Sequence, residues 1–499
     1  MKPFYLTTSI VYPNANPHIG YALELVQADF LARYYRDQGR ELYFLTGVDE
    51  HGLKLQRAAE AEGKTPRAFV DDKATVFRRL LEVLDISSDR FIRTTDPDHE
   101  AMAQAIWRAC AANGDIYKKK YRAWYNVKEE EFLGLADEVD DPAWFGIDPR
   151  FIELIDEENY FFRLSKYKDR LVELLERSEY KVLPKGRLQE MLNFVKEKGL
   201  SDISVSREAS KLSWGIPVPD DASQVMYVWF DALTNYLTAA ATVDGRGDIQ
   251  VDEKWPADLH CVGKDIHRFH ALIWPGMLLS AGLPLPKELL VHGFFTSGGQ
   301  KMSKSIGNVV DPFAEVSRFG KEAVRWFLLK ETPMTGDADY TSERVQQVME
   351  ADLANDLGNL VSRVWTMCQK YCQGAVPESS VPVPLEKEWE AYHLLVEERR
   401  VDEALKVAHG VLAACNKRID EEKPWVLAKD PSQQARLHDL LYALLENIRQ
   451  VTAMLRPALP DTAKRIEQEL FAGHNLNESL VPGALGSEPI ILFPKERHD

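Results

Sequence analysis

Residues 7–21 of the chain read TTSIVYPNANPHIGY, and this stretch decides the fold class. The apolar run at residues 4–10 predicts a strand, which two prolines and a turn-like Asn-Ala-Asn bring to an end. Helical spacing begins directly after His18 and continues to Gly39, a plausible C-cap. A second apolar run, ELYFLTG at residues 41–47, follows. Strand, helix and strand in this order predict a parallel sheet.

Composition sets the class of protein. The chain has 499 residues, enough for roughly three domains by the usual size of about 150 residues each. Lysine and arginine number 61 against 78 acidic residues, which gives −17 and excludes a nonspecific cationic nucleic-acid coat. Five cysteines, an odd number, do not form a disulfide framework and favour a reducing compartment. No apolar run approaches about 18 residues and MKPFYLTT lacks a signal-peptide core, so a soluble, cytoplasmic enzyme without a membrane span is expected.

The patterning changes along the chain and predicts five segments. An α/β pattern opens the chain, a more polar and acidic stretch reads as an insertion, and the parallel-sheet pattern resumes at LHCVGKD and ELLVHGFFT. Long amphipathic segments such as LLVEERRVDEALKVAHGVLAACNKRI then favour a helical bundle. The expected boundaries are 1–116 and 225–300 for the two halves of the α/β domain, 117–224 for the insertion, 301–351 for a linking region and 352–499 for the helical domain.

Two short motifs point to phosphate chemistry. His18 and Gly20 stand at the start of a helix that follows a strand, where backbone amides attract phosphate. An isolated HIG could equally be a helix start with no further role. The sequence KMSKS at residues 301–305 follows a later strand and a Gly-rich turn, and it places two lysines on a loop. A solvated basic loop would explain it alone, but two separated motifs in this order support each other.

Together, PHIGY and KMSKS resemble the HIGH and KMSKS signatures of class I aminoacyl-tRNA synthetases. The stretches TGVDEHG, YVWFDALTNY, VGKDIHRFHALIWP, DLGNLVSR and EEKPWVLAK extend the resemblance over nearly the whole chain and make it similar to the methionyl-tRNA synthetase family. The family implies a Rossmann-like α/β catalytic domain with a connective insertion, followed by an α-helical anticodon-binding bundle. It also implies a ligase that activates L-methionine with ATP and Mg²⁺ and transfers it to methionine tRNA, initiator and elongator.

The resemblance assigns a catalytic set to the two motifs. Its members are His18, Gly20, Tyr21, Lys301, Ser303 and Lys304. Negative charge builds on the phosphoryl oxygens and on pyrophosphate, so catalysis needs positioned donors and cations more than a covalent intermediate. His18 would donate to these oxygens, Lys301 and Lys304 would clamp pyrophosphate, and the SGG stretch would supply mobility. Tyr21 stands where the family has its second histidine, which leaves most of the charge stabilisation to His18 and the lysines.

The resemblance also implies two binding sets. Methionine has an uncharged thioether, so its pocket should be apolar and aromatic, with Asp49 pairing the α-ammonium. The methionine set is Ile10, Tyr12, Asp49, Trp229, Ala232, Leu233, Tyr236, Ile266, His270 and Trp274. The ATP set is His18, Gly20, Gly263, Lys264, Asp265, His292, Gly293 and Lys304. Plain core packing remains the alternative for the aromatics and for His270.

The insertion is informative for the residues it lacks. Many relatives hold zinc there through CxxC knuckles, but no cysteine lies between Cys110 and Cys261, and Asn126 and Glu129 stand near the expected thiolate positions. A four-thiolate zinc site is therefore excluded, and no structural metal is expected. Cys368 and Cys372 read as a core pair. The insertion, about a hundred residues long, is also shorter than the editing domains of the isoleucine, valine and leucine enzymes.

The helical domain carries the expected anticodon contacts. Asn359 and Arg363 share one helix face, and Trp425 follows Pro424, which together would hydrogen-bond and stack unpaired bases. A salt-bridged bundle surface is the alternative for these three residues. The chain is expected to be a monomer without an appended domain. A silent paralogue would have lost His18 or the KMSKS lysines, and an unrelated nucleotidylyltransferase would lack this helical domain.

Overall fold

The computed structural model describes residues 2–126, 131–135, 139, 141–302 and 307–493. Its contacts divide the chain into two compact units, and each is described by itself. The first unit comprises residues 1–17, 35–82 and 87–292, and the second comprises residues 18–34, 83–86 and 293–499. Helix α1 (Ile19–Asp37) belongs mostly to the second unit.

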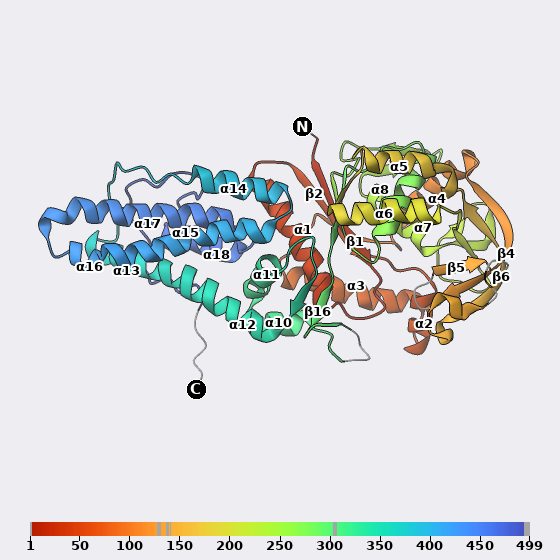
Figure 1. Cartoon of the computed structure of the whole chain (residues 1–499), viewed down its shortest axis with the longest axis horizontal. Helices are drawn as coiled ribbons and strands as arrows, with labels where there is room; N and C mark the ends of the chain where they lie inside the picture. The colour runs from red at the N-terminus through yellow and green to blue at the C-terminus, as the bar shows by residue number, and fades with distance from the viewer. Residues whose placement is uncertain (1, 127–130, 136–138, 140, 303–306, 494–499) are drawn as a thin grey trace. The chain divides into compact units, whose positions relative to one another are not determined.

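A six-stranded parallel sheet forms the centre of the first unit (Figure 1). Leu6 of its central strand lies opposite Phe44 on one side and Leu259 on the other. In spatial order, the strands are β3 (Arg90–Arg93), β2 (Leu42–Val48), β1 (Phe4–Val11), β14 (Leu259–Gly263), β15 (Glu288–His292) and β7 (Lys181–Leu183). The predicted α/β class with a parallel sheet is confirmed, and the strands expected from the opening of the chain are β1 and β2.

The helices of the first unit pack on this sheet and extend from it. Helix α4 shows the reason, since Met102, Ile106 and Cys110 recur at every fourth position and are all buried. These helices are α2 (Leu53–Ala61), α3 (Pro66–Val83), α4 (Pro97–Ala112), η3 (Leu164–Tyr167), α5 (Lys168–Glu176), α6 (Lys185–Lys198), α7 (Val228–Leu233), α8 (Asn235–Thr238), the π-helix η4 (Phe269–Ile273) and α9 (Trp274–Ser280).

Residues 117–224, expected as an insertion, contribute β7 to the parallel sheet and also build antiparallel sheets of their own. The longest pair runs from Ile116 opposite Phe162 to Asn126 opposite Ile152. This region and its neighbours contain β4 (Ile116–Asn126), β5 (Glu131–Leu135), η1 (Pro142–Phe145), η2 (Pro149–Phe151), β6 (Ile152–Phe162), β8 (Ile203–Ser204), β9 (Ser206–Glu208), β10 (Pro217–Val218), β11 (Asp221–Met226), β12 (Ala241–Val243) and β13 (Ile249–Val251).

The second unit is mainly helical. In its long bundle helices the apolar positions recur every seven residues, as in Leu405, Leu412 and Ile419, which are all buried. Its elements after α1 are β16 (Phe295–Ser297), β17 (Gln300–Lys301), α10 (Pro312–Phe319), α11 (Lys321–Lys330), β18 (Ala338–Tyr340), α12 (Ser342–Val348), the π-helix η5 (Met349–Gly358), α13 (Asn359–Tyr371), α14 (Glu386–Glu397), α15 (Val401–Glu422), α16 (Pro424–Leu427), η6 (Pro431–Gln433), α17 (Gln434–Leu455), α18 (Pro460–Arg465) and η7 (Ile466–Leu470). Helices α13, α15 and α17 lie side by side (Figure 1). The predicted helical C-terminal region is confirmed.

The amphipathic stretch at residues 394–419 is two helices and not one. Helix α14 ends at Glu397 and α15 begins at Val401, because Arg399 has a φ of 64°, which a helix cannot accommodate. The periodicity alone hides this break, since apolar residues on both sides keep helical spacing.

A buried ion pair ties the second unit together. The fully buried guanidinium of Arg325 lies 2.8 Å from the carboxylate of Asp29, which is also fully buried. Arg325 also donates to the carbonyl oxygens of Leu84, Pro457 and Ala458 at 3.0–3.1 Å. One side chain therefore joins α1, α11 and the segment after α17.

All five cysteines are free thiols, and Cys368 is buried in α13. Across the ranges given above, none of the helices combines the length and the apolar character needed to cross a membrane.

Candidate active site

The HIG segment has a defined geometry at the start of α1. His18 is exposed, and its Nδ1 accepts a hydrogen bond of 3.0 Å from the backbone N–H of Gly20. Since Nδ1 accepts, the neutral ring must carry its proton on Nε2. His18 therefore offers a donor at Nε2.

Gly20 is needed for this arrangement. A Cβ atom at position 20 would lie 2.8 Å from Cε1 and 3.0 Å from Nδ1 of His18, closer than atoms of these types approach. The glycine had been expected to let the backbone approach phosphate. The structure adds a more specific reason, which is room for the His18 ring.

Tyr21 lies in the first turn of α1 and is 6% exposed. Its backbone N–H donates to the carbonyl oxygen of His18 at 3.0 Å. The residue that replaces the family's second histidine is thus buried and helps to close the first helical turn.

The start of α1 is joined to the segment that follows KMSKS. The N–H of Ile19, next to His18, donates to the carbonyl oxygen of Val310 at 3.0 Å. Both belong to the second unit, and Val310 lies five residues beyond the motif. The fold thus brings together the neighbourhoods of the two motifs that the sequence separates by almost 300 positions.

A hairpin presents the KMSKS segment. Strands β16 and β17 pair antiparallel through Gly298 and Gly299, whose φ values of 61° and 74° are those of a tight type I′ turn. Asp339 of β18 accepts from the N–H of Gly299 at 2.8 Å. The SGG stretch is therefore a hydrogen-bonded turn, and its mobility stays a prediction. Lys301 ends β17, and Ser303 and Lys304 lie outside the described residues.

The methionine set lies within the first unit, at the carboxyl ends of adjacent strands. Ile10 and Tyr12 come from the end of β1 and Asp49 from the end of β2, where Val11 lies opposite Val48. The others come from α7, α8, the turn before η4, η4 itself and the start of α9; they are Trp229, Ala232, Leu233, Tyr236, Ile266, His270 and Trp274. Ligands bind at this edge in parallel α/β sheets.

A hydrogen-bond chain fixes the aromatic wall. His270 lies in the π-helix η4, a rare element that often marks functional sites. Its Nδ1 is 3.0 Å from the carbonyl oxygen of Ile266, so Nδ1 carries the proton and donates. Nε2 then accepts from the hydroxyl of Tyr236 at 2.7 Å. In the neutral form of His270, both ring nitrogens are therefore paired within the protein.

A second aromatic contact involves Trp229 of the methionine set. The ring of Trp229 stacks on that of Phe269, with centroids 3.8 Å apart and an interplanar angle of 12°. Tyr236 also contacts Trp274, with ring centroids 6.0 Å apart. Trp229 is only partly buried, so its ring can pack on Phe269 and still contact a ligand. Trp274 is fully buried and packs in the core.

The ATP set falls into the two units. In the first, Gly263 ends β14 opposite His292 of β15, and a Cβ atom at position 263 would lie 2.7 Å from Oδ1 of Asp265. Asp265 is exposed and can accept from ribose hydroxyls, and Lys264 precedes it. In the second, Gly293 packs so closely on Gly336 that a Cβ atom would lie 2.2 Å from its carbonyl oxygen.

A buried carboxylate that the motifs did not reveal links the segment of Asp49 to the segment of Trp229. Asp231 is fully buried; Nδ1 of His51 lies 2.9 Å and Nε2 of His99 lies 3.3 Å from its oxygens. Burial raises its pKa, but the two histidines outweigh this and hold the pKa below its ordinary value. His51 follows Asp49 by two positions and Asp231 follows Trp229 by two. Both stood within quoted family stretches, and only their pairing was hidden.

The anticodon candidates are all in the second unit. Asn359 begins α13 and is exposed, and Arg363 lies one turn later. The guanidinium of Arg363 is 3.0 Å from the carboxylate of Asp420 near the end of α15. Trp425 follows in α16 and is 43% exposed. An ion pair therefore links the helix that carries the two polar candidates to the segment that carries the indole.

One acidic cluster near these helices resembles a cation site. Donor atoms of Asp352, Asp356 and His409 lie within 4.8 Å of one another. Asp352 already accepts from the ammonium of Lys330 and, at 3.0 Å, from the indole N–H of Trp326. The Asp352 carboxylate of this cluster is therefore already paired with a lysine ammonium and an indole N–H.

Comparisons with known proteins show the family of the chain. The family model described as tRNA synthetases class I (M) matches residues 4–140 and 146–365. A methionine–tRNA ligase from Brucella suis biovar 1 is 44% identical over 93% of this chain and 91% of its own. The enzyme of that name from Mesorhizobium japonicum is 41% identical over 99% of this chain and 98% of its own.

Solved structures give the same result. The Mycobacterium tuberculosis methionyl-tRNA synthetase in complex with methionyl-adenylate superposes with a TM-score of 0.91 and 39% identity, covering 99% of this chain and all of that one. Its apo form superposes with a TM-score of 0.84 and 35% identity, covering 100% of this chain and 99% of that one. The chain belongs to the methionyl-tRNA synthetases of the class I tRNA synthetase family.

Proposed function

We propose that the residues described above carry out the two steps of a methionine–tRNA ligase, which is the activity of this chain. In the first step the carboxylate of L-methionine attacks the α-phosphorus of ATP, giving methionyl-adenylate and pyrophosphate. In the second, a ribose hydroxyl at the 3′ end of methionine tRNA attacks the methionyl carbonyl, and AMP leaves.

The observation that carries the residue assignment is the geometry of His18. Its Nδ1 is held by the N–H of Gly20, so Nε2 donates toward the phosphoryl oxygens that gain charge in the transition state. Lys301 and Lys304 clamp the leaving pyrophosphate, with Ser303 between them. Tyr21, being buried, contributes to the helix start more than to the charge. ATP enters as its magnesium complex, whose cation shares the phosphate charge.

On the amino-acid side, Asp49 pairs with the α-ammonium of methionine. The thioether lies against the neutral Tyr236 and His270 wall and the Trp229 ring, where sulfur meets aromatic edges. Asp265 binds the ribose of ATP, and Gly263, Lys264, His292 and Gly293 surround the adenosine.

The anticodon contacts in the helical domain are assigned in the same way. Asn359, Arg363 and Trp425 read the anticodon of initiator and elongator methionine tRNA by hydrogen bonds and stacking. Arg363 must exchange Asp420 for RNA when it does so. The enzyme works as a cytoplasmic monomer without structural zinc.

Pyrophosphate exchange measured with each of the twenty amino acids tests the proposal. Exchange should depend on methionine, and His18→Ala or Lys304→Ala should slow it by roughly 100-fold, the scale of one lost charge-stabilising donor. Tyr21→Phe should cost less than His18→Ala. Near-normal exchange in both His18→Ala and Lys304→Ala would overturn the assigned roles.

A further inference from the structure

The Asp231 carboxylate lies on a helix of the methionine set but has no role among those assigned so far. Trp229, Ala232 and Leu233 stand at positions i, i+3 and i+4 of α7, so they share one face of this helix. Asp231 is two positions from Trp229 and therefore lies on a different face. It is thus placed to act on methionine through the position of α7 and not by direct contact.

Two imidazoles from other elements hold this carboxylate. A carboxylate can only accept, so Nδ1 of His51, after β2, donates to one oxygen of Asp231 at 2.9 Å. Nε2 of His99, in α4, lies 3.3 Å from the other oxygen. All three side chains are buried, Asp231 and His99 fully so. Since a buried carboxylate is costly unless it is paired, these bonds fix α7 against two neighbouring elements.

The segment that carries His51 is itself anchored to the parallel sheet. The backbone N–H of Glu50 donates to the hydroxyl of Thr94 at 2.8 Å. The fully buried carboxylate of Glu50 also pairs with Arg93 of β3 at 2.8 Å. Asp49 directly precedes this anchor and His51 directly follows it, so both have a fixed base, and His51 extends this base to α7.

A further member of the methionine set meets the same histidine. The hydroxyl of Tyr12, which follows β1, donates to the backbone carbonyl oxygen of His51 at 2.6 Å. His51 therefore bonds to Tyr12 through its backbone and to Asp231 through its ring. One residue connects the segments after β1 and β2 with α7.

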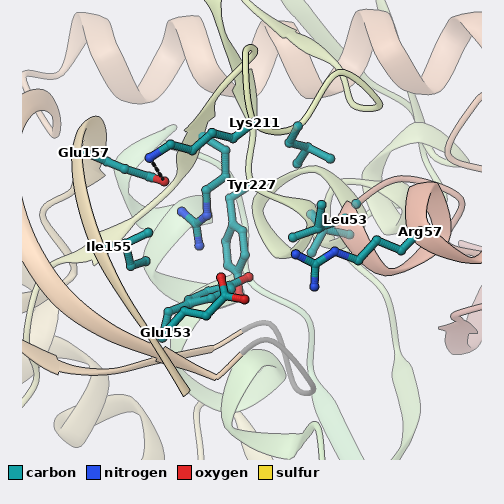
Figure 2. A pocket seen from close by; sticks show the side chains of 12 residues that line it. Leu53, Arg57, Glu153, Ile155, Glu157, Lys211 and Tyr227 are labelled. Carbon is teal, nitrogen blue, oxygen red and sulfur yellow. Dashed lines mark hydrogen bonds and ion pairs between the residues drawn. The ribbon is translucent and has the colours of Figure 1, made fainter. Parts of the chain in front are cut away.

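A cavity of about 310 Å³ borders the two segments that the His51 to Asp231 bond joins (Figure 2). Gly52 lines it beside His51, and Tyr227 and Val228 line it just before Trp229. From there the cavity extends to Arg57 of α2 and Glu153 of β6. On this side the buried hydrogen bond, and not continuous packing, ties the two segments together.

We propose that His51 and Asp231 are positioning residues that set the distance between Asp49 and the methionine face of α7, and thereby the side-chain length that the amino-acid site accepts. The inference rests on the proposed function, in which Asp49 pairs with the α-ammonium and Trp229 contacts the thioether. These two groups lie at opposite ends of the methionine side chain. A fixed separation between Asp49 and Trp229 therefore selects a side chain of matching length.

Methionine-dependent pyrophosphate exchange by two variants of His51 tests the proposal. Leucine removes the donor, whereas the amide nitrogen of asparagine can take the place of Nδ1 and donate to Asp231. We expect His51→Leu to raise KM for methionine roughly 10- to 100-fold, the scale of a hydrogen bond to a charged group, with KM for ATP within about twofold of the parent. His51→Asn should recover most of this loss. Asp231→Asn cannot accept from both imidazoles and should behave like His51→Leu.

Ethionine, which is one methylene longer than methionine, supplies the second measurement. One methylene is discriminated by roughly 10- to 200-fold, so the parent should prefer methionine by about that factor in kcat/KM. His51→Leu and Asp231→Asn should reduce this preference by at least about fivefold, because α7 is no longer held at its distance from Asp49. His51→Asn should restore it.

Asp258→Asn is the matched control. Asp258 is also a buried carboxylate and pairs with Lys287 at 2.6 Å, but it precedes β14 and lies at the amino end of the parallel strands, away from the methionine set. This variant should unfold at a lower temperature than the parent, with the parental KM for methionine and the parental preference over ethionine.

Parental KM and preference in both His51→Leu and Asp231→Asn would overturn the proposal. It would also be overturned if His51→Asn were no better than His51→Leu, or if Asp258→Asn showed the same losses, since the effect would then be one of stability alone. A parent chain without methionine-dependent exchange, or Asp49→Asn with the parental KM for methionine, would instead overturn the proposed function.

Discussion

The contact between Gly20 and the His18 ring gives the most direct test of the catalytic geometry. Gly20→Ala adds one methyl group, 2.8 Å from Cε1 of His18. Gly20 has no positive φ, so alanine can adopt its backbone conformation, and a helix prefers alanine by up to about 1 kcal/mol. The exposed ring will yield before the backbone does, and the hydrogen bond from the Gly20 N–H to Nδ1 will be lost.

The consequence is a chain that folds at least as well as the parent and activates methionine poorly. Removing one positioned donor from a developing anion costs about 2.7–4 kcal/mol, or roughly 100- to 1,000-fold in rate. Pyrophosphate exchange should fall by that amount, while methionine binding, followed by tryptophan fluorescence, should change little.

A double variant separates this cause from others. If alanine at position 20 acts only by moving the imidazole, adding it to His18→Ala should cost nothing further, since the ring is already absent. Exchange by Gly20→Ala near the parent rate would refute the reasoning, as would a double variant whose losses multiply. The first result would mean that the ring has room, and the second that Gly20 serves the phosphates directly.

Four further outcomes are expected. Arg325→Ala should lower the free energy of unfolding by about 3–5 kcal/mol, because three carbonyl oxygens lose their buried donor and the buried Asp29 keeps only Arg33, 2.7 Å away, as a cation. Adding Asp29→Asn should recover part of this loss in urea unfolding, and no recovery would contradict the pairing of Arg325 with Asp29. Burial lowers the pKa of His260 well below 6.5, so the unfolded chain binds a proton more readily than the folded one and the free energy of unfolding falls as the pH drops below 6.5. His260→Asn should reduce this fall by up to about 1.4 kcal/mol per pH unit in urea unfolding. The same pH dependence in the variant and the parent would contradict this. Trp425→Ala should weaken charging of methionine tRNA roughly 5- to 150-fold and leave exchange unchanged, whereas parallel losses would mark a packing residue. Protein dialysed against a strong chelator should regain full activity with magnesium alone, and stoichiometric zinc in elemental analysis would refute this.

Local patterns were sufficient to predict the parallel sheet and the helical region. A run of strand formers at residues 4–10 and helical spacing after His18 are properties of neighbouring residues, and β1 and α1 follow them closely. Single-residue conformations were not predictable in this way. Arg399 breaks the long amphipathic stretch through its own positive φ, and the two-residue turn at Gly298 and Gly299 likewise depends on the positive φ of each glycine.

Pairings across long separations were also hidden. Nothing near Asp29 in the sequence indicates that its partner is Arg325, and nothing near His51 indicates Asp231. Each pair is specified by the exclusion of water around it, which only the assembled fold provides. The cavity of Figure 2 was hidden in the same way, because Arg57 belongs to helix α2 and Glu153 to strand β6 of the inserted region, which only the assembled fold brings together.

The hydrogen bonds of Tyr236 and His270 show how such pairings would produce selectivity in the proposed methionine site. The carbonyl oxygen of Ile266 can only accept, so it fixes the proton of His270 on Nδ1, and Nε2 must then accept from Tyr236. Both nitrogens of the imidazole are thus hydrogen-bonded within the protein, and the Tyr236 hydroxyl donates its proton to His270. A side chain that enters must therefore bring little demand for hydrogen bonds, and burying an unpaired hydroxyl or charge there would cost it several kcal/mol. A thioether makes no such demand and gains from contact with the rings, so under the proposed assignment methionine is selected through hydrogen bonds that Tyr236 and His270 make with their own neighbours.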